Sequence, residues 1–72
     1  MAIVKVIEVL AQSEQSWEDA VQQALNETKK TIRNIQSIYV KEFQAIVDQQ
    51  QNISVYRVNC KVSFVVDDAS RD

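Results

Sequence analysis

Few residues of this chain have the type and spacing that catalysis requires. The sequence of 72 residues contains no His, so it lacks the side chain most used in general acid–base catalysis and transition-metal ligation. It contains no Gly either, which excludes a Gly-rich phosphate-binding loop. No nucleophile is accompanied by a base and an orienting group. The sequence therefore offers no support for enzymatic activity.

Two pairs of carboxylates are the only candidates for binding a cation. Glu42 and Asp48 lie six positions apart, and an even spacing on a strand places two side chains on one face. Asp67 and Asp68 are adjacent and could hold a hard cation weakly through oxygen. Because no further acid, base or metal motif accompanies either pair, we interpret all four as solvated charges and predict no metal site.

Cys60 and Trp17 are the remaining candidates for chemistry. Cys60 lies on the apolar side of an alternating segment, whereas reactive thiols need exposure and electropositive neighbours. We therefore predict that it is a small buried hydrophobe. Trp17 belongs to a helical apolar stripe, which favours a core or subunit-contact aromatic over a platform for stacking a ligand.

Polar side chains that could bind a ligand lie on one side of the segment "VYRVNCKVSFVV". Its apolar side carries Tyr56, Val58, Cys60, Val62, Phe64 and Val66, and its polar side carries Arg57, Asn59, Lys61 and Ser63. On residues 37–47, one side is predicted to carry Ser37, Tyr39, Lys41 and Phe43. If several copies pack with these polar sides together, they line a cleft or cavity. A solvated sheet face remains the alternative.

Length and composition bound the class of protein. The chain fits a single domain over residues 1–72, and a chain this short buries only about 60% of its unfolded surface. Because 46% of its residues are hydrophobic, some apolar surface is expected between subunits. The net charge is −2 and no basic cluster exceeds Lys29-Lys30, so nucleic acid is not an expected partner. Neither a membrane span nor a signal peptide is expected, which suggests the cytoplasm.

The elements that must position these residues follow the order strand, helix, strand, strand. "IVKVIEVL" at 3–10, residues 37–47 and residues 53–66 are predicted strands, and 48–52 is a polar turn. Residues 67–72 form a charged tail, expected to be mobile. The turn pairs strands two and three as a hairpin, and a right-handed crossover places strand one antiparallel to strand three. The predicted fold class is α+β, a β-α-β-β domain with a three-stranded antiparallel sheet wrapped on one helix.

The helix is predicted within "SWEDAVQQALNETKKTIRNI", residues 16–35. Ser16 and Asp19 have the capping-box spacing, with Asp in place of the usual Glu. One apolar stripe runs along Trp17, Ala20, Val21, Ala24, Leu25, Thr28, Ile32 and Ile35. Lys29, Lys30 and Arg33 are expected near the helix C-terminus, where the dipole favours positive charge. This helix covers one sheet face, and the other face has no helix to cover it.

These segments together resemble the dodecin family. The likeness rests on the order of "VIEVLAQS", "SWEDAVQQAL", "KKTIRNI", "YVKEF" and "YRVNCKVSF" over residues 3–66. The resemblance implies a small cytosolic protein of bacteria or archaea, with twelve copies in a hollow shell. It also implies a non-enzymatic role in binding, storing or sequestering a ligand, which in many members is a flavin bound in pairs between subunits.

The chain departs from the flavin-binding pattern at the ligand positions implied by this resemblance, Ser37, Tyr39 and Arg57. Ser37 stands where such members have a Trp that stacks on the flavin, and Arg57 stands where they have a flavin-bonding Gln. Near residue 11, where the resemblance implies a Gly in a loop, this chain has Ala11. We therefore predict weak or no binding of FMN or riboflavin. The alternatives are a flavin-independent structural or metal-binding assembly, or a smaller oligomeric protein-interaction module.

Overall fold

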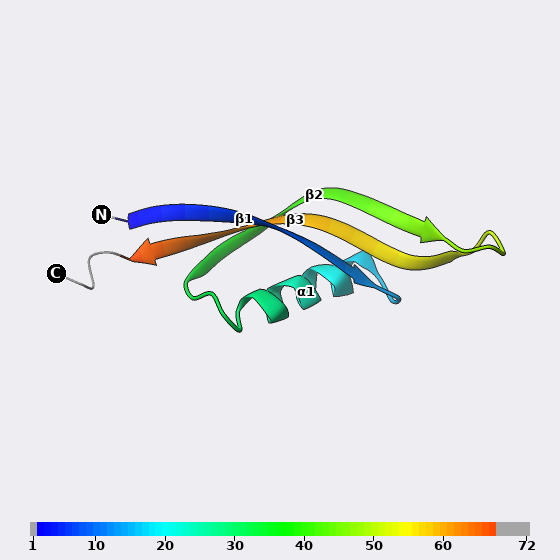
Figure 1. Cartoon of the computed structure of the whole chain (residues 1–72), viewed down its shortest axis with the longest axis horizontal. Helices are drawn as coiled ribbons and strands as arrows, with labels where there is room; N and C mark the ends of the chain where they lie inside the picture. The colour runs from blue at the N-terminus through cyan, green and yellow to red at the C-terminus, as the bar shows by residue number, and fades with distance from the viewer. Residues whose placement is uncertain (1, 68–72) are drawn as a thin grey trace.

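The computed structural model describes residues 2–67. Four elements follow one another: β1 (Ala2–Ser13), α1 (Trp17–Thr28), β2 (Ile35–Val47) and β3 (Ile53–Asp67). The α+β class and the β-α-β-β order predicted from the sequence are confirmed (Figure 1). Asp67, which we expected in a mobile tail, instead ends β3 and pairs with Ala2. The rest of that predicted tail, 68–72, lies outside the described residues.

The sheet has the strand order β1-β3-β2, and both strand pairs are antiparallel. The predicted hairpin of strands two and three and the predicted place of strand one beside strand three are thus confirmed. β1 is longer than predicted and continues to Ser13, which lies opposite Tyr56. Because β3 is the central strand, its apolar side chains receive cover from both neighbours as well as from α1.

α1 begins where the capping residues predict but ends earlier than the apolar stripe predicts. Ser16 is the N-cap, and its Oγ accepts a hydrogen bond from the Asp19 backbone N–H at 3.0 Å. The helix ends at Thr28, so the prediction of a helix to residue 35 was wrong. Asn34 has a φ of 61°, a left-handed conformation that Asn tolerates, and Ile35 then pairs with Phe64 as the first residue of β2.

The early end of α1 also changes where the basic residues lie. Lys29, Lys30 and Arg33 follow the helix, and the last turn of α1 contains no basic residue. Lys29 is the C-cap and Lys30 is the next residue, so both lie at the helix C-terminus as expected, whereas Arg33 lies beyond it. Lys30 also forms an exposed ion pair with Glu27 at 2.8 Å. No helix among residues 2–67 is long and apolar enough to span a membrane.

The core lies between α1 and one face of the sheet. Ala20 of α1 packs against Val58 and Cys60 of β3, and all three are fully buried. Small side chains on α1 allow the helix to approach the strand closely. Val62, also on the helix-facing side of β3, is fully buried as predicted. The opposite face of the sheet, which we call the free face, carries Arg57, Asn59, Lys61 and Ser63 and is not covered by a helix (Figure 1).

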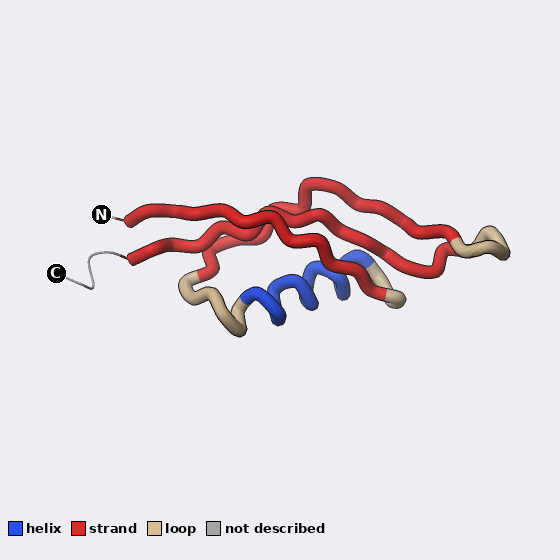
Figure 2. Tube along the Cα trace, viewed as in Figure 1, coloured by secondary structure: helices blue, strands red, loops and turns tan. Residues whose placement is uncertain are grey.

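The molecule is much longer than its helix. The principal extents are 59 × 19 × 14 Å, whereas the 12 residues of α1 span about 18 Å. The sheet therefore runs past both ends of α1: the paired ends of β1 and β3 extend beyond one end, and the β2–β3 hairpin beyond the other (Figure 2). The radius of gyration is 15.2 Å, against about 11 Å for a compact chain of this length.

A β-bulge in β2 reverses the expected faces of its second half. Val40 pairs with Cys60 and Glu42 pairs with the adjacent Asn59, so Lys41 is an extra residue that has no partner on β3. The extra residue moves Phe43 to the helix side, where its ring lies 5.9 Å from that of Trp17. The prediction that Ser37, Tyr39, Lys41 and Phe43 share one side was therefore wrong for Phe43.

Candidate functional site

The three predicted ligand positions all belong to strands of the sheet, but one chain does not bring them together. Ser37 lies opposite Ser63, and their hydroxyl oxygens are 2.5 Å apart. Arg57 lies six residues away from Ser63 along β3, which corresponds to about 20 Å. A ligand that contacts both Ser37 and Arg57 would therefore have to bridge different copies of the chain.

Tyr39 is an exposed member of the predicted ligand residues. It lies opposite Lys61 on the free face, and 64% of its surface is accessible. Nearby, Lys41 Nζ forms an ion pair with Glu8 Oε2 at 3.6 Å. Tyr39 thus offers an accessible ring next to positive charge, but no described cavity encloses it.

Arg57 lines a cleft of about 270 Å³, which we call the Arg57 cleft. The lining residues come from all three strands: Leu10, Glu42, Phe43, Gln44, Arg57 and Asn59. The Arg57 Nε–H donates a hydrogen bond to Gln12 Oε1 at 3.1 Å, which orients the guanidinium group. The sequence indicated Arg57 and Asn59 as members of a polar face. It did not indicate Glu42 and Gln44, because their side is set by the bulge at Lys41.

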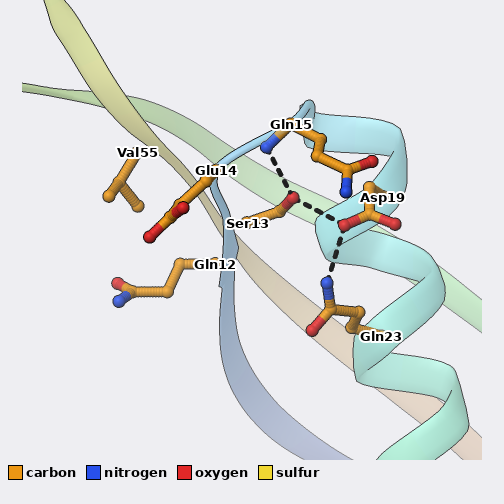
Figure 3. A pocket seen from close by; sticks show the side chains of 7 residues that line it. All are labelled: Gln12, Ser13, Glu14, Gln15, Asp19, Gln23 and Val55. Atoms are coloured by element: carbon orange, nitrogen blue, oxygen red, sulfur yellow. Dashed lines mark hydrogen bonds between the residues drawn. The ribbon is translucent and has the colours of Figure 1, made fainter.

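A second, polar cleft of about 390 Å³ lies where β1 leads into α1. Figure 3 shows Ser13 at its centre, hydrogen-bonded on one side to Gln15 and on the other to Asp19. The Ser13 Oγ–H donates to Asp19 Oδ2 at 2.6 Å, and Gln23 Nε2 donates to the same oxygen at 2.6 Å. These two hydrogen bonds, the one from Ser13 first, hold the pKa of the Asp19 carboxyl below its ordinary value. The polar groups of Ser13, Asp19 and Gln23 thus hydrogen-bond to one another, and these bonds join β1 to α1.

A third cavity is an apolar groove of about 410 Å³ between α1 and β2, lined by Trp17, Glu18, Val21, Val40 and Phe43. Trp17 packs edge-on against Tyr56, with ring centres 4.9 Å apart. Its Nε1–H donates to the Gln44 carbonyl oxygen at 3.2 Å. Trp17 is therefore a half-buried packing residue, as its place in the stripe predicts, and its ring is not presented as a free stacking platform.

The remaining sequence candidates have structural roles or lie apart. Cys60 is fully buried, and burial raises the pKa of its thiol, which opposes formation of the thiolate. Glu42 and Asp48 do not share a face of one strand, since Asp48 follows β2 and accepts hydrogen bonds from the Gln50 and Asn52 backbone N–H groups. Among the described residues, no three His, Cys, Asp or Glu side chains gather as a metal site.

Comparison with known proteins agrees with this architecture. The family model described as Dodecin matches residues 3–67. The calcium dodecin of Mycobacterium tuberculosis (strain ATCC 25618 / H37Rv) is 33% identical over 64 residues, which are 89% of this chain and 89% of that protein.

Solved structures give the same result. A crystal structure of a Thermus thermophilus dodecin mutant superposes with a TM-score of 0.87 at 28% identity, covering 94% of this chain and 100% of the other. The crystal structure of calcium dodecin from M. tuberculosis, described as a calcium-chelating antigen with a novel calcium-binding site, superposes with a TM-score of 0.80 at 30% identity, covering 93% and 94%. Dodecins are non-enzymatic binding proteins that form homo-oligomers. The chain belongs to the dodecin family.

Proposed function

We propose that this protein is a cytoplasmic homododecamer whose shell binds and stores a small ligand without transforming it. The observation that carries the proposal is the apolar surface that one chain leaves open. Eight large hydrophobic side chains are between 48% and 70% exposed: Ile3, Val4, Val6, Leu10, Tyr39, Phe43, Val47 and Ile53. They lie largely on the parts of the sheet that α1 does not cover.

The energetics of a short chain support assembly. Monomeric proteins rarely expose large contiguous apolar surfaces, and burying such surface stabilises a complex in proportion to its area. Among residues 2–67 the largest fully buried side chains are Val58, Val62 and Cys60, so the core of one chain is small. The number twelve, the hollow shell and the ligand-storage role rest on the family resemblance.

The mass of the particle tests this proposal. Light scattering or native mass spectrometry should give about 100 kDa, twelve times the 8.3 kDa of one chain. Ile53→Lys places a charge on an exposed apolar residue at the hairpin end and should lower the mass. Gln49→Lys adds the same charge to the neighbouring turn and serves as the matched control. A wild-type mass of one, two or three chains would contradict the proposal.

Calcium storage is a second candidate, favoured by the calcium dodecin that is 33% identical to this chain. No group of three candidate ligands forms within the described part of one chain, so a calcium ion would need carboxylates from more than one copy. Calorimetric titration with Ca²⁺ and with Mg²⁺ tests it. This candidate requires that the assembled protein bind Ca²⁺ and that the dissociated Ile53→Lys variant not bind it.

A further inference from the structure

The Arg57 cleft is assembled by two neighbouring rows of residues that cross the sheet. One row is Gln12, Arg57 and Gln44, and the next is Leu10, Asn59 and Glu42, each written in the order β1, β3, β2. Glu42 and Gln44 join the free face because the bulge at Lys41 sets their side. The cleft is thus a product of the strand register and of the bulge together.

The two charged residues of this cleft do not neutralise each other. The ion pairs among the described residues are Lys30–Glu27 and Lys41–Glu8, and neither includes Arg57 or Glu42. The guanidinium group is held by its Nε–H bond to Gln12, which leaves its terminal N–H groups without a partner among the described residues. A cation and a carboxylate therefore line one cleft of about 270 Å³ with space between them.

The other lining groups add an acceptor and an apolar wall. Asn59 Oδ1 is buried and has no hydrogen-bond donor among the described residues. Leu10, which is 70% exposed and lies opposite Asn59 on the free face, lines the same cleft. A ligand that donates N–H bonds and has a small apolar portion matches these groups.

We propose that the Arg57 cleft binds a small zwitterion with an apolar body, of the class of aliphatic α-amino acids. The ligand carboxylate accepts hydrogen bonds from the terminal N–H groups of Arg57, a geometry that the planar guanidinium favours. The ligand ammonium group faces Glu42 and the amide of Asn59, and the aliphatic side chain lies against Leu10. An anion alone would meet the Glu42 carboxylate, and a cation alone would meet Arg57. This inference rests on the proposed storage function and names the class of stored ligand.

Three related probes test the charge requirement. L-leucine, 3-methylbutylamine and 4-methylpentanoate share the aliphatic body, but the second lacks the carboxylate and the third lacks the ammonium group. Calorimetric titration of the full-length protein should show that L-leucine binds at least tenfold more tightly than either analogue. Equal binding of all three, or no binding of L-leucine, would overturn the inference.

Variants test the residues. Arg57→Gln and Glu42→Gln should each weaken L-leucine binding at least tenfold. Lys61→Gln and Glu8→Gln remove one charge of each sign from the next row of the sheet and are the matched controls, expected to change the affinity less than twofold. Unchanged affinity in the first two variants would overturn the assignment even if the wild type binds. Should either variant fail to fold, the comparison of the three probes on the wild type decides alone.

Light scattering on the same samples separates this inference from the proposed function. A dodecamer without L-leucine binding overturns only the zwitterion site. A particle of one to three chains overturns the proposed assembly, and its titration still decides the zwitterion site because all lining residues belong to one chain.

Discussion

Ser13, Ser16 and Asp19 join the end of β1 to the start of α1 through side-chain hydrogen bonds. Ser16 caps the helix, as the spacing of Ser16 and Asp19 predicts. Ser13, which precedes the cap, is buried and donates to the Asp19 carboxylate. The local capping signal could be predicted because its partners are three residues apart. The hydrogen bond from Ser13 to Asp19 depends on β1 continuing to Ser13, which the spacing of nearby residues does not predict.

The Asp19 cluster predicts a defined loss of stability in acid. The carboxyl pKa is lowered in the folded state from its ordinary value of 3.8 by hydrogen bonds from Ser13 and then Gln23. The unfolded chain therefore takes up the proton at a higher pH than the folded chain. This contribution to stability is present above pH 3.8 and is lost as the pH falls below it, through the folded pKa.

Thermal unfolding followed by circular dichroism between pH 6 and pH 3 measures this loss. Asp19→Asn should unfold with a shallower dependence on pH than the wild type in the acid range. Gln23→Ala should reduce the dependence partly, whereas Gln22→Ala, which removes a neighbouring amide bonded to Asn26, should keep it. Identical pH profiles for wild type and Asp19→Asn would show that the cluster does not stabilise the charged carboxylate.

At the scale of the elements, the order and pairing of the strands were predictable, but the end of the helix and the bulge were not. The apolar stripe continues through Ile32 and Ile35. Ile35 nevertheless pairs with Phe64 as the first residue of β2, a pairing that is impossible if the helix continues to residue 35. Likewise, alternation in β2 predicts the faces correctly up to Lys41 and fails after it. Both failures occur where pairing with a distant strand overrides the local pattern.

The bulge predicts which deletion the sheet tolerates. Removing Lys41 joins Val40 to Glu42, and normal alternation then keeps Val40 on the helix side and Glu42 on the free face. The lost ion pair with Glu8 is exposed and is worth less than about 1 kcal/mol. We therefore expect the Lys41 deletion to fold and to melt cooperatively in circular dichroism.

Deletion of Tyr39 is the matched control for this prediction. It also shortens β2 by one residue, but it turns Val40 toward the free face and Lys41 toward the core. We expect this variant to be insoluble or unfolded. If both deletions behave alike, Lys41 is not the residue that the sheet accommodates as an extra one.

Because β3 is the central strand and its helix-facing side forms the core, we expect a charged side chain at the middle of this side to prevent folding. Val62 is fully buried, so Val62→Asp buries an unpaired carboxylate at a cost of several kcal/mol. That cost is comparable with the total stability of a small domain, about 5 kcal/mol. We expect this variant to show no cooperative unfolding in circular dichroism or denaturant titration. Ser63→Asp introduces the same group one residue away on the free face and should stay folded; a cooperatively unfolding Val62→Asp would show that this side of β3 is not the core.

At the scale of the whole molecule, the sequence indicated an uncovered sheet face but not how the sites on it are distributed. The ligand positions taken from the family resemblance, Ser37 and Arg57, lie about 20 Å apart along one sheet, as the register and the rise per residue require. Residues that meet only when copies assemble cannot be identified from alternation within one chain. The Arg57 cleft, by contrast, lies within one chain, and its residues follow from the register once the bulge is known.

This distribution supports the prediction that the wild-type protein binds riboflavin or FMN weakly or not at all. Ser37 cannot stack on a flavin, and stacking contributes about 0.5–1.5 kcal/mol beyond area burial, which is up to about a tenfold change in affinity. Arg57 only donates hydrogen bonds, whereas the flavin edge requires both a donor and an acceptor. Its charge could attract the phosphate of FMN, so any binding should favour FMN over riboflavin.

Quenching of flavin fluorescence measures this prediction at micromolar concentrations of assembled protein. The double variant Ser37→Trp with Arg57→Gln should bind riboflavin more tightly than the wild type, because it restores both the stacking ring and an amide that donates and accepts. Each single variant should gain less than the double variant, since it restores only one of the two groups. If adding Ile53→Lys to the double variant dissociates the assembly and abolishes the gain in riboflavin binding, the binding site spans subunits. Submicromolar affinity of the wild type for riboflavin would contradict the prediction, because neither Ser37 nor Arg57 could then be the residue that limits flavin binding.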